Sequence, residues 1–148
     1  MLIFQWIFIV TTLWIGFILA ISFMEAPLKF RAPSVTLPIG LEIGQLVFQM
    51  LNRIEGLFAV LTAISLFVAL VSLPTVVIAL VVIWIWVLQT WLLYTRLDPR
   101  AKAIIRGEPV GKTSYHKYYV GLELCKLILL CFLVYFQLQD FQVHLLSG

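Results

Sequence analysis

Charged residues are scarce in this chain of 148 residues. Only 11% are Asp, Glu, Lys or Arg, whereas 63% are hydrophobic, and the mean hydropathy is +1.08. A soluble domain of this length has a high ratio of surface to volume and could not hide so much apolar surface. The composition therefore excludes an ordinary soluble domain and predicts that most of the chain lies in a lipid bilayer.

The chain is also poor in residues that build disulfides, metal sites and haem sites. Cys125 and Cys131 fall on different faces of one predicted helix, about 9 Å apart along its axis, so we expect buried free thiols and no disulfide. His116 and His144 lie at opposite ends of the same helix and cannot bracket one haem in a protomer. No cofactor and no metal are therefore predicted, and a single-histidine haem at His116 is kept as an alternative.

Long apolar runs take the place of the missing charge. Crossing the hydrocarbon of a bilayer takes about 20 mostly apolar residues in a helix, and the chain offers four such runs. We predict one all-α domain, 1–148, that forms an antiparallel bundle with spans at about 2–23, 38–71, 75–95 and 115–138. The second helix would be about 50 Å long and should project into the cytoplasmic interface.

The positive charges predict how the bundle is oriented. Apart from Lys126, all Lys and Arg residues lie in Lys29–Arg53 or Arg96–Lys117. The positive-inside rule places these two connections in the cytoplasm and both termini outside. The first run has no Lys or Arg before it, so we expect an uncleaved first span and not a secretory signal. The expected location is a bacterial inner membrane, and the net charge of +3 needs no nucleic-acid partner.

The connection after the third span is typical of a short interfacial helix at 97–107. Asp98 suits its N-cap and Gly107 its C-terminal cap. Apolar side chains can dip into lipid while basic ones meet anionic headgroups. The basic residues are Arg100, Lys102 and Arg106.

The stretch GEPVGKTS, which follows this segment, looks like the end of a phosphate-binding loop. The motif needs four residues between its glycines, but Gly107 and Gly111 are separated by three. A membrane hairpin precedes it instead of a strand. The spacing therefore excludes nucleotide binding. This stretch is better explained as a helix start, with Thr113 or Ser114 capping the fourth span.

The second helix has one face that begins polar and then becomes small. Its residues follow at steps of three and four, which keeps them on one side of a helix. The small half lets another helix approach closely. The face comprises Glu42, Gln45, Gln49, Asn52, Gly56, Ala59 and Ala63.

The fourth helix has a matching polar face. It comprises His116, Tyr119, Glu123 and Lys126. Glu123 can pair with Lys126, and Arg53 and Glu55 can cross-pair with them, so that the four charges cancel. Ionisable groups inside a membrane are costly and point to function. Two interpretations stay open: the charges snorkel to the interface and only join two helices, or they line a polar cavity open to the cytoplasm.

Three short motifs resemble those of a known family. EAPLKF ends the first span at Glu25–Phe30, LDPR ends the third at Leu97–Arg100, and the fourth contains Lys117–Tyr119 and Leu124–Leu127. In these motifs the chain resembles bacterial four-span membrane proteins of unknown function that are similar to human transmembrane protein 205. The resemblance implies a four-helix membrane bundle, but it implies no reaction and no catalytic residues. The family pattern has a histidine in the fourth span where this chain has Tyr119.

The sequence contains no convergent Ser, His and Asp set for hydrolysis and no metal-ligand cluster. Isolated polar residues such as Gln89 and Thr90 are expected only to bond a neighbouring helix. We therefore expect a non-enzymatic protein that uses the polar face between the second and fourth helices, either transporter-like or a subunit or assembly factor of a membrane complex. Besides lipid, its expected partners are other membrane subunits or a second copy of itself.

Two alternative functions remain. One is a membrane redox or cofactor-binding enzyme that would use His116, Tyr119 and Glu123. The other is a structural homo-oligomer that would pack along a seam of small residues. The seam would comprise Gly56, Ala59 and Ala63.

Overall fold

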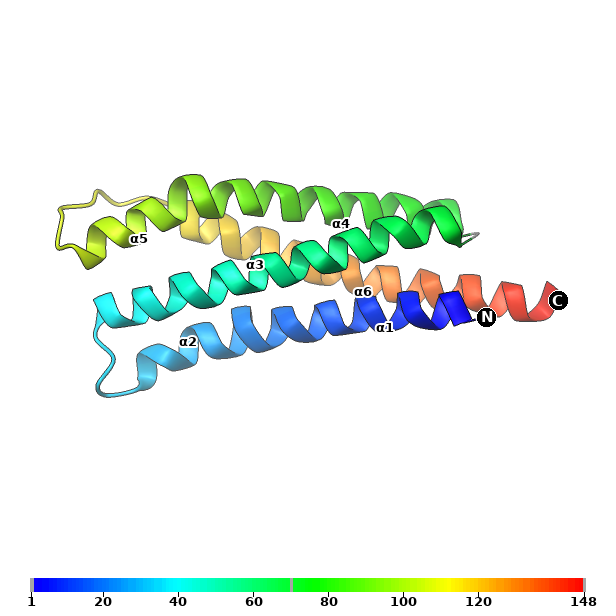
Figure 1. The fold of residues 1–148 in the computed structure, drawn as a ribbon, viewed down its shortest axis with the longest axis horizontal. Helices are drawn as coiled ribbons and strands as arrows, with labels where there is room; N and C mark the ends of the chain where they lie inside the picture. Colours follow the sequence, from blue (N-terminus) through cyan, green and yellow to red (C-terminus); the bar gives the residue numbers. More distant parts are fainter. Residues whose placement is uncertain (1, 70, 148) are drawn as a thin grey trace.

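The computed structural model describes residues 2–69 and 71–147. Helices and short connections make up this part of the chain, and it contains no strand. Four long helices pack side by side, with both chain termini at one end of the bundle and α5 at the other (Figure 1). We call these the terminal end and the α5 end. The predicted all-α bundle of four helices is confirmed.

Each of the four helices is long and apolar enough to cross a membrane. A run of apolar residues reports the thickness of hydrocarbon that a helix can cross, and not where the helix ends. The helices accordingly extend beyond most of the predicted spans. The candidate membrane spans are Phe4–Arg31, Leu37–Val68, Leu73–Ile105 and Tyr115–Leu146.

The first long helix is built from several segments. α1 (Leu2–Ile18) continues into a π-helical stretch, η1 (Leu19–Glu25), and then into α2 (Ala26–Leu28). A 3-10 turn, η2 (Lys29–Arg31), ends the helix. π-helical turns and prolines such as Pro27 are the usual places at which a helix changes direction. Ser22 lies in η1 and Lys29 in η2, in this part of the helix.

The second and third long helices are joined by a short turn. α3 (Leu37–Val68) has Pro38 in its first turn, where a proline is tolerated. α4 (Leu73–Leu92) continues through a π-helical turn, η3 (Leu93–Leu97), into α5 (Asp98–Ile105). The predicted interfacial helix is therefore a continuation of the third span.

Asp98 does not have the predicted role of an N-cap. The chain is already helical at Leu97, so the backbone N–H groups of α5 find acceptors in the preceding turn. Gly107 has φ of +74°, a left-handed conformation that glycine adopts readily, and it follows the end of α5 as predicted. The fourth long helix, α6, spans Tyr115–Ser147.

An apolar layer fills the middle of the bundle, and each long helix contributes to it. Its buried residues are Trp14, Ile18, Phe58, Ala59, Ala79, Val82, Leu130 and Leu133. The predicted small face of α3 takes part, since Ala59 is buried in the layer and Gly56 lies directly against Trp86. Such close packing, together with hydrogen bonds, is what associates helices in a membrane.

Polar contacts close the bundle at the terminal end. The carboxylate of Asp140, on α6, accepts a hydrogen bond from the Ser72 backbone N–H at 3.2 Å and one from the Thr75 hydroxyl at 2.6 Å. Asp140 thus satisfies a backbone donor at the start of α4 from a neighbouring helix. Gln137 donates to Thr11 at 3.0 Å and joins α6 to α1.

The prediction that Cys125 and Cys131 are buried is wrong. Both are exposed free thiols on the outer face of α6. In a membrane bundle, a small and weakly polar side chain can face lipid as readily as the interior. Neither cysteine contributes to the core.

Candidate functional site

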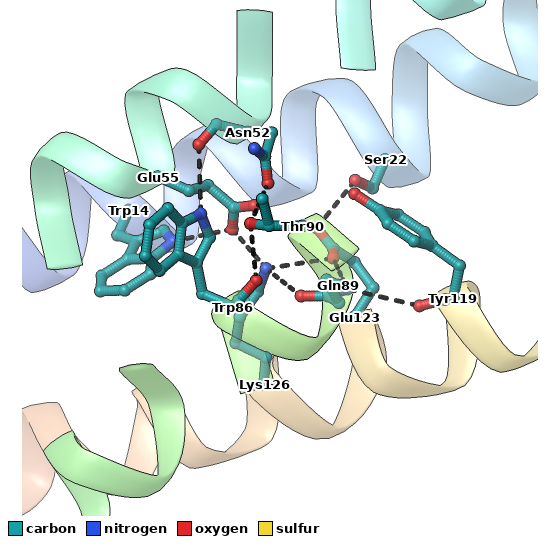
Figure 2. A network of polar contacts seen from close by, with 10 residues as sticks. All are labelled: Trp14, Ser22, Asn52, Glu55, Trp86, Gln89, Thr90, Tyr119, Glu123 and Lys126. Carbon is teal, nitrogen blue, oxygen red and sulfur yellow. Dashed lines mark hydrogen bonds and ion pairs between the residues drawn. The ribbon is translucent and has the colours of Figure 1, made fainter. Parts of the chain in front are cut away.

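Three charged side chains meet in the interior of the bundle. Glu55 comes from α3, and Glu123 and Lys126 come from α6 (Figure 2). The Lys126 ammonium lies 3.1 Å from Glu123 Oε2 and forms a second ion pair with Glu55 Oε1. Each of the three side chains is at most 1% exposed. The predicted pair of Glu123 and Lys126 is therefore present, and Glu55 joins it. We call these three residues the charge cluster.

Gln89 connects the charge cluster to α4. Its amide NH₂ donates to Glu123 Oε2, and its carbonyl oxygen accepts from Lys126 Nζ at 2.6 Å. Trp14 Nε1 donates to Glu55 Oε1 at 2.8 Å, and the Ser22 hydroxyl donates to Glu123 Oε1 at 3.0 Å. All four long helices therefore supply a polar group to one network.

Helical periodicity explains why the charges converge. Glu123 and Lys126 are three residues apart on α6 and so share one face. On α3, Glu55 shares the buried face with Asn52 and Phe58, three residues on either side of it. The two helices present these faces to each other across the bundle.

The prediction of a neutral network of four charges is wrong. Arg53 is exposed, and it makes no ion pair among the described residues. It lies two residues before Glu55, which turns it about 200° around the helix and away from the cluster. Lys126 does not snorkel either, because its side chain is fully buried. With all three groups ionised, the charge cluster would have a formal charge of −1.

Asn52 belongs to a second polar group beside the charge cluster. Its side-chain oxygen accepts from the Thr90 hydroxyl at 2.8 Å, and its backbone oxygen accepts from Trp86 Nε1 at 3.1 Å (Figure 2). These bonds tie α3 to α4. Thr90 thus bonds a neighbouring helix, as predicted for an isolated polar residue.

A cavity of about 540 Å³ opens at the α5 end of the bundle. It lies between the end of the first long helix, the start of α3, the segment η3–α5 and the start of α6. Ser22 and Glu123 are the lining residues that lie deepest along α1–η1 and along α6, respectively. Because Glu123 also belongs to the charge cluster, the cavity ends at the cluster. The lining of the cavity therefore meets the buried polar interior of the bundle at Glu123.

Tyr119 lines this cavity between its mouth and the charge cluster. The residue is only 3% exposed, and its ring meets Phe48 edge-on with centroids 5.9 Å apart. Its hydroxyl has no hydrogen-bond partner within the described part of the chain. A buried hydroxyl without a partner is costly. Tyr119 therefore brings to the lining of the cavity a hydroxyl whose donor and acceptor are both unused by the described residues.

The other predicted polar residues have different positions. The side-chain NH₂ of Gln45 donates to the backbone oxygen of Asp98 at 2.9 Å, and that of Gln49 donates to the Asp98 carboxylate at 2.6 Å. Both bonds fasten α3 to α5. His116 is exposed and lines the cavity, whereas Glu42 is exposed and not part of the lining.

Two of the three basic side chains predicted to meet lipid headgroups have protein partners. Arg100 donates to the backbone oxygen of Gly111 at 2.6 Å, and Arg106 donates to the Glu108 carboxylate at 2.6 Å. The hydrogen bond from Arg106 lowers the pKa of Glu108 below its ordinary value of 4.5. Lys102 is exposed.

Sequence reasoning missed Trp14 and Ser22 entirely and undervalued Gln89. One signal was available for Gln89, because it continues the buried face of Val82 and Ile85 at steps of three and four residues. Among the described residues, no group of three or more His, Cys, Asp and Glu is placed to hold a metal ion. Comparisons with known protein families, curated proteins and solved structures find no match for the chain.

Proposed function

We propose that the chain is a multi-pass protein of a bacterial cytoplasmic membrane that binds a small, largely apolar ligand and acts as a non-enzymatic, transporter-like protein. The observation that carries the proposal is the cavity of about 540 Å³ that ends at Glu123 of the charge cluster. Its volume falls within the range of about 300–1,000 Å³ that is usual for small-molecule sites. Such sites combine apolar walls with a few polar groups that orient the ligand.

The lining supports a ligand with an apolar body and one polar end. Most of the wall is apolar and includes Phe23, Phe30, Phe48, Leu93, Leu97 and Ile104. Near the inner end, the Tyr119 hydroxyl is free to donate, while Glu123 already accepts three hydrogen bonds or ion pairs. A carbonyl or hydroxyl oxygen on the ligand would satisfy Tyr119.

The position of the apolar layer supports a transporter-like role. The cavity and the charge cluster lie on its α5 side, and the contacts of Gln137 and Asp140 lie on its terminal side. Leu130 and Leu133 are fully buried between Lys126 and Gln137 on α6. A site that is open to one side and closed by packing on the other is what one state of an alternating-access carrier requires.

Native mass spectrometry of the protein, released gently from its own membranes, tests the proposal. We expect the wild type to have an added mass of a few hundred daltons. Ala101→Phe should remove this mass because Ala101 lines the cavity. Ala103→Phe is the matched control, since Ala103 lies on the same helix, is also half-buried and does not line the cavity.

The pair of variants separates a bound ligand from lipid that adheres to the outer surface. Loss of the added mass in Ala101→Phe alone supports the proposal. A wild-type mass equal to the bare chain, or an added mass that both variants keep equally, would overturn it.

A further inference from the structure

The charge cluster has one more acid than base. Glu55, Glu123 and Lys126 would sum to −1 if all were ionised, and Arg53, which was expected to balance them, faces away. An uncompensated charge inside an apolar bundle is very costly. The cluster therefore needs one further positive charge.

Among the described residues, no other basic side chain forms an ion pair with the charge cluster. Lys29 lines the cavity, but its ammonium group pairs with Glu25 at 3.3 Å. α1 and α4, which pack against the cluster, contain no titratable side chain and contribute Trp14 and Gln89. η1 contributes the Ser22 hydroxyl, and its one titratable residue, Glu25, is an acid. α6 adds one further group that faces the cluster, the buried phenol of Tyr119, which is neutral or negative and never positive. The compensating charge must be a cation that binds.

The hydrogen bonds indicate which carboxyl group is neutral. Glu123 receives donors on both of its oxygens, from Ser22 on Oε1 and from Gln89 and Lys126 on Oε2. Glu55 receives Trp14 and Lys126 on Oε1 alone, and its Oε2 is buried without a partner among the described residues. An ionised carboxylate accepts on both oxygens, and leaving one bare in the interior costs more than leaving a neutral hydroxyl there. Glu123 is thus built as the ionised member and Glu55 as the neutral one.

A proton fits this position better than a metal cation. Metal ions that bind to oxygen take about six or more ligands, whereas the bare Oε2 of Glu55 is the one unpartnered acceptor of the cluster. A proton needs one oxygen only.

From this arrangement we propose that Glu55 holds one exchangeable proton on Oε2, so that the charge cluster is a proton-binding site next to the cavity. The proposal goes beyond ligand binding and does not depend on it. Glu123 belongs to both the cavity wall and the cluster, which gives the cluster its contact with the open end of the bundle. Lys126 touches both carboxyl groups, so a change of charge at Glu123 alters how firmly Glu55 retains its proton.

Infrared spectroscopy of the full chain in lipid nanodiscs, with glutamate labelled at its carboxyl carbon, tests this site. At neutral pH the wild type should show one buried, protonated glutamic acid by its carbonyl stretch. Counting the charges of the cluster predicts no buried, protonated glutamic acid in Glu55→Gln or in Glu123→Gln. It predicts two such acids in Lys126→Met. Glu42 is exposed on α3, the helix that also contains Glu55. Glu42→Gln should therefore leave the band unchanged.

A second pair of variants assigns the proton to Glu55. Trp14→Phe removes a donor from the carbonyl oxygen of Glu55 and should raise the frequency of the band. Ser22→Ala removes a donor from Glu123 and should leave the frequency unchanged. This comparison remains informative if the variants of the charged residues fail to fold.

Either of two results would overturn the proposal. One is a wild-type protein without a buried acid band, which would mean that another cation balances the cluster. The other is a band that persists in Glu55→Gln or responds to Ser22→Ala and not to Trp14→Phe. Because no ligand is added, these outcomes are independent of whether the cavity binds one.

Discussion

Trp14 donates its indole N–H to the Oε1 atom of Glu55 at 2.8 Å, and this bond joins α1 to α3 (Figure 2). Both side chains are fully buried. The indole ring also packs against Phe58, with ring centroids 6.0 Å apart. An indole N–H can only donate, so Trp14 requires an acceptor at this depth in the bundle. One contact therefore stabilises the helix packing and holds a member of the charge cluster in place.

Replacing Trp14 by Phe should reduce the free energy of unfolding by about 1–3 kcal/mol. The variant loses the hydrogen bond to a buried carboxyl group and leaves a small void in the apolar layer. Reversible unfolding in mixed micelles, followed by far-ultraviolet circular dichroism, measures the change.

Trp84→Phe is the matched control for this substitution. Trp84 is 62% exposed on the outside of α4, so its truncation should change the unfolding free energy by less than about 0.5 kcal/mol. Equal effects of the two substitutions would contradict the role assigned to the contact between Trp14 and Glu55.

The fold was predictable because apolar runs of about 20 residues leave few alternatives. The ends of the helices were less predictable, since hydropathy does not report where a helix leaves the hydrocarbon. The continuous path from α4 through η3 into α5 shows this clearly. Asp98 and Pro99 are typical of a helix start, but here they lie inside a longer helix.

The candidate site was predictable only where its residues share a helix. The spacing of Glu123 and Lys126 indicated their pair, and the polar start of α3 indicated which helix would meet them. Periodicity within one helix cannot say which residue of another helix lies opposite. For that reason the sequence indicates neither that Gln89 lies beside the charge cluster nor that Glu55, and not Arg53, faces Lys126.

Gly56 should not tolerate alanine, although alanine is the better helix former. A Cβ atom at Gly56 would lie 2.9 Å from Cζ2 of Trp86, whose ring is held by its bond to the backbone oxygen of Asn52. We expect Gly56→Ala to reduce the unfolding free energy by about 1–3 kcal/mol, more than the gain of about 1 kcal/mol in helix propensity.

Gly16→Ala provides the comparison for this prediction. No atom of the described residues lies within 4 Å of a Cβ atom at Gly16, so the propensity gain should appear there without opposition, as an increase of up to about 1 kcal/mol. The same unfolding measurement applies to both variants. An increase in stability for both glycines would show that Trp86 moves aside freely and that α3 and α4 are not closely packed at this point.

The proposed orientation places the mouth of the cavity in the cytoplasm, and cysteine labelling can test it. Cys125 and Cys131 are exposed on the outer face of α6, so both can be replaced by alanine before a single cysteine is introduced at Lys102 or Gln142. These two positions are exposed near opposite ends of the bundle. A maleimide that does not cross the cytoplasmic membrane should label Gln142→Cys in intact cells, and Lys102→Cys only after permeabilisation, because Lys and Arg are retained on the cytoplasmic side. The reverse pattern would turn the cavity and Glu123 toward the outside and contradict the proposed orientation.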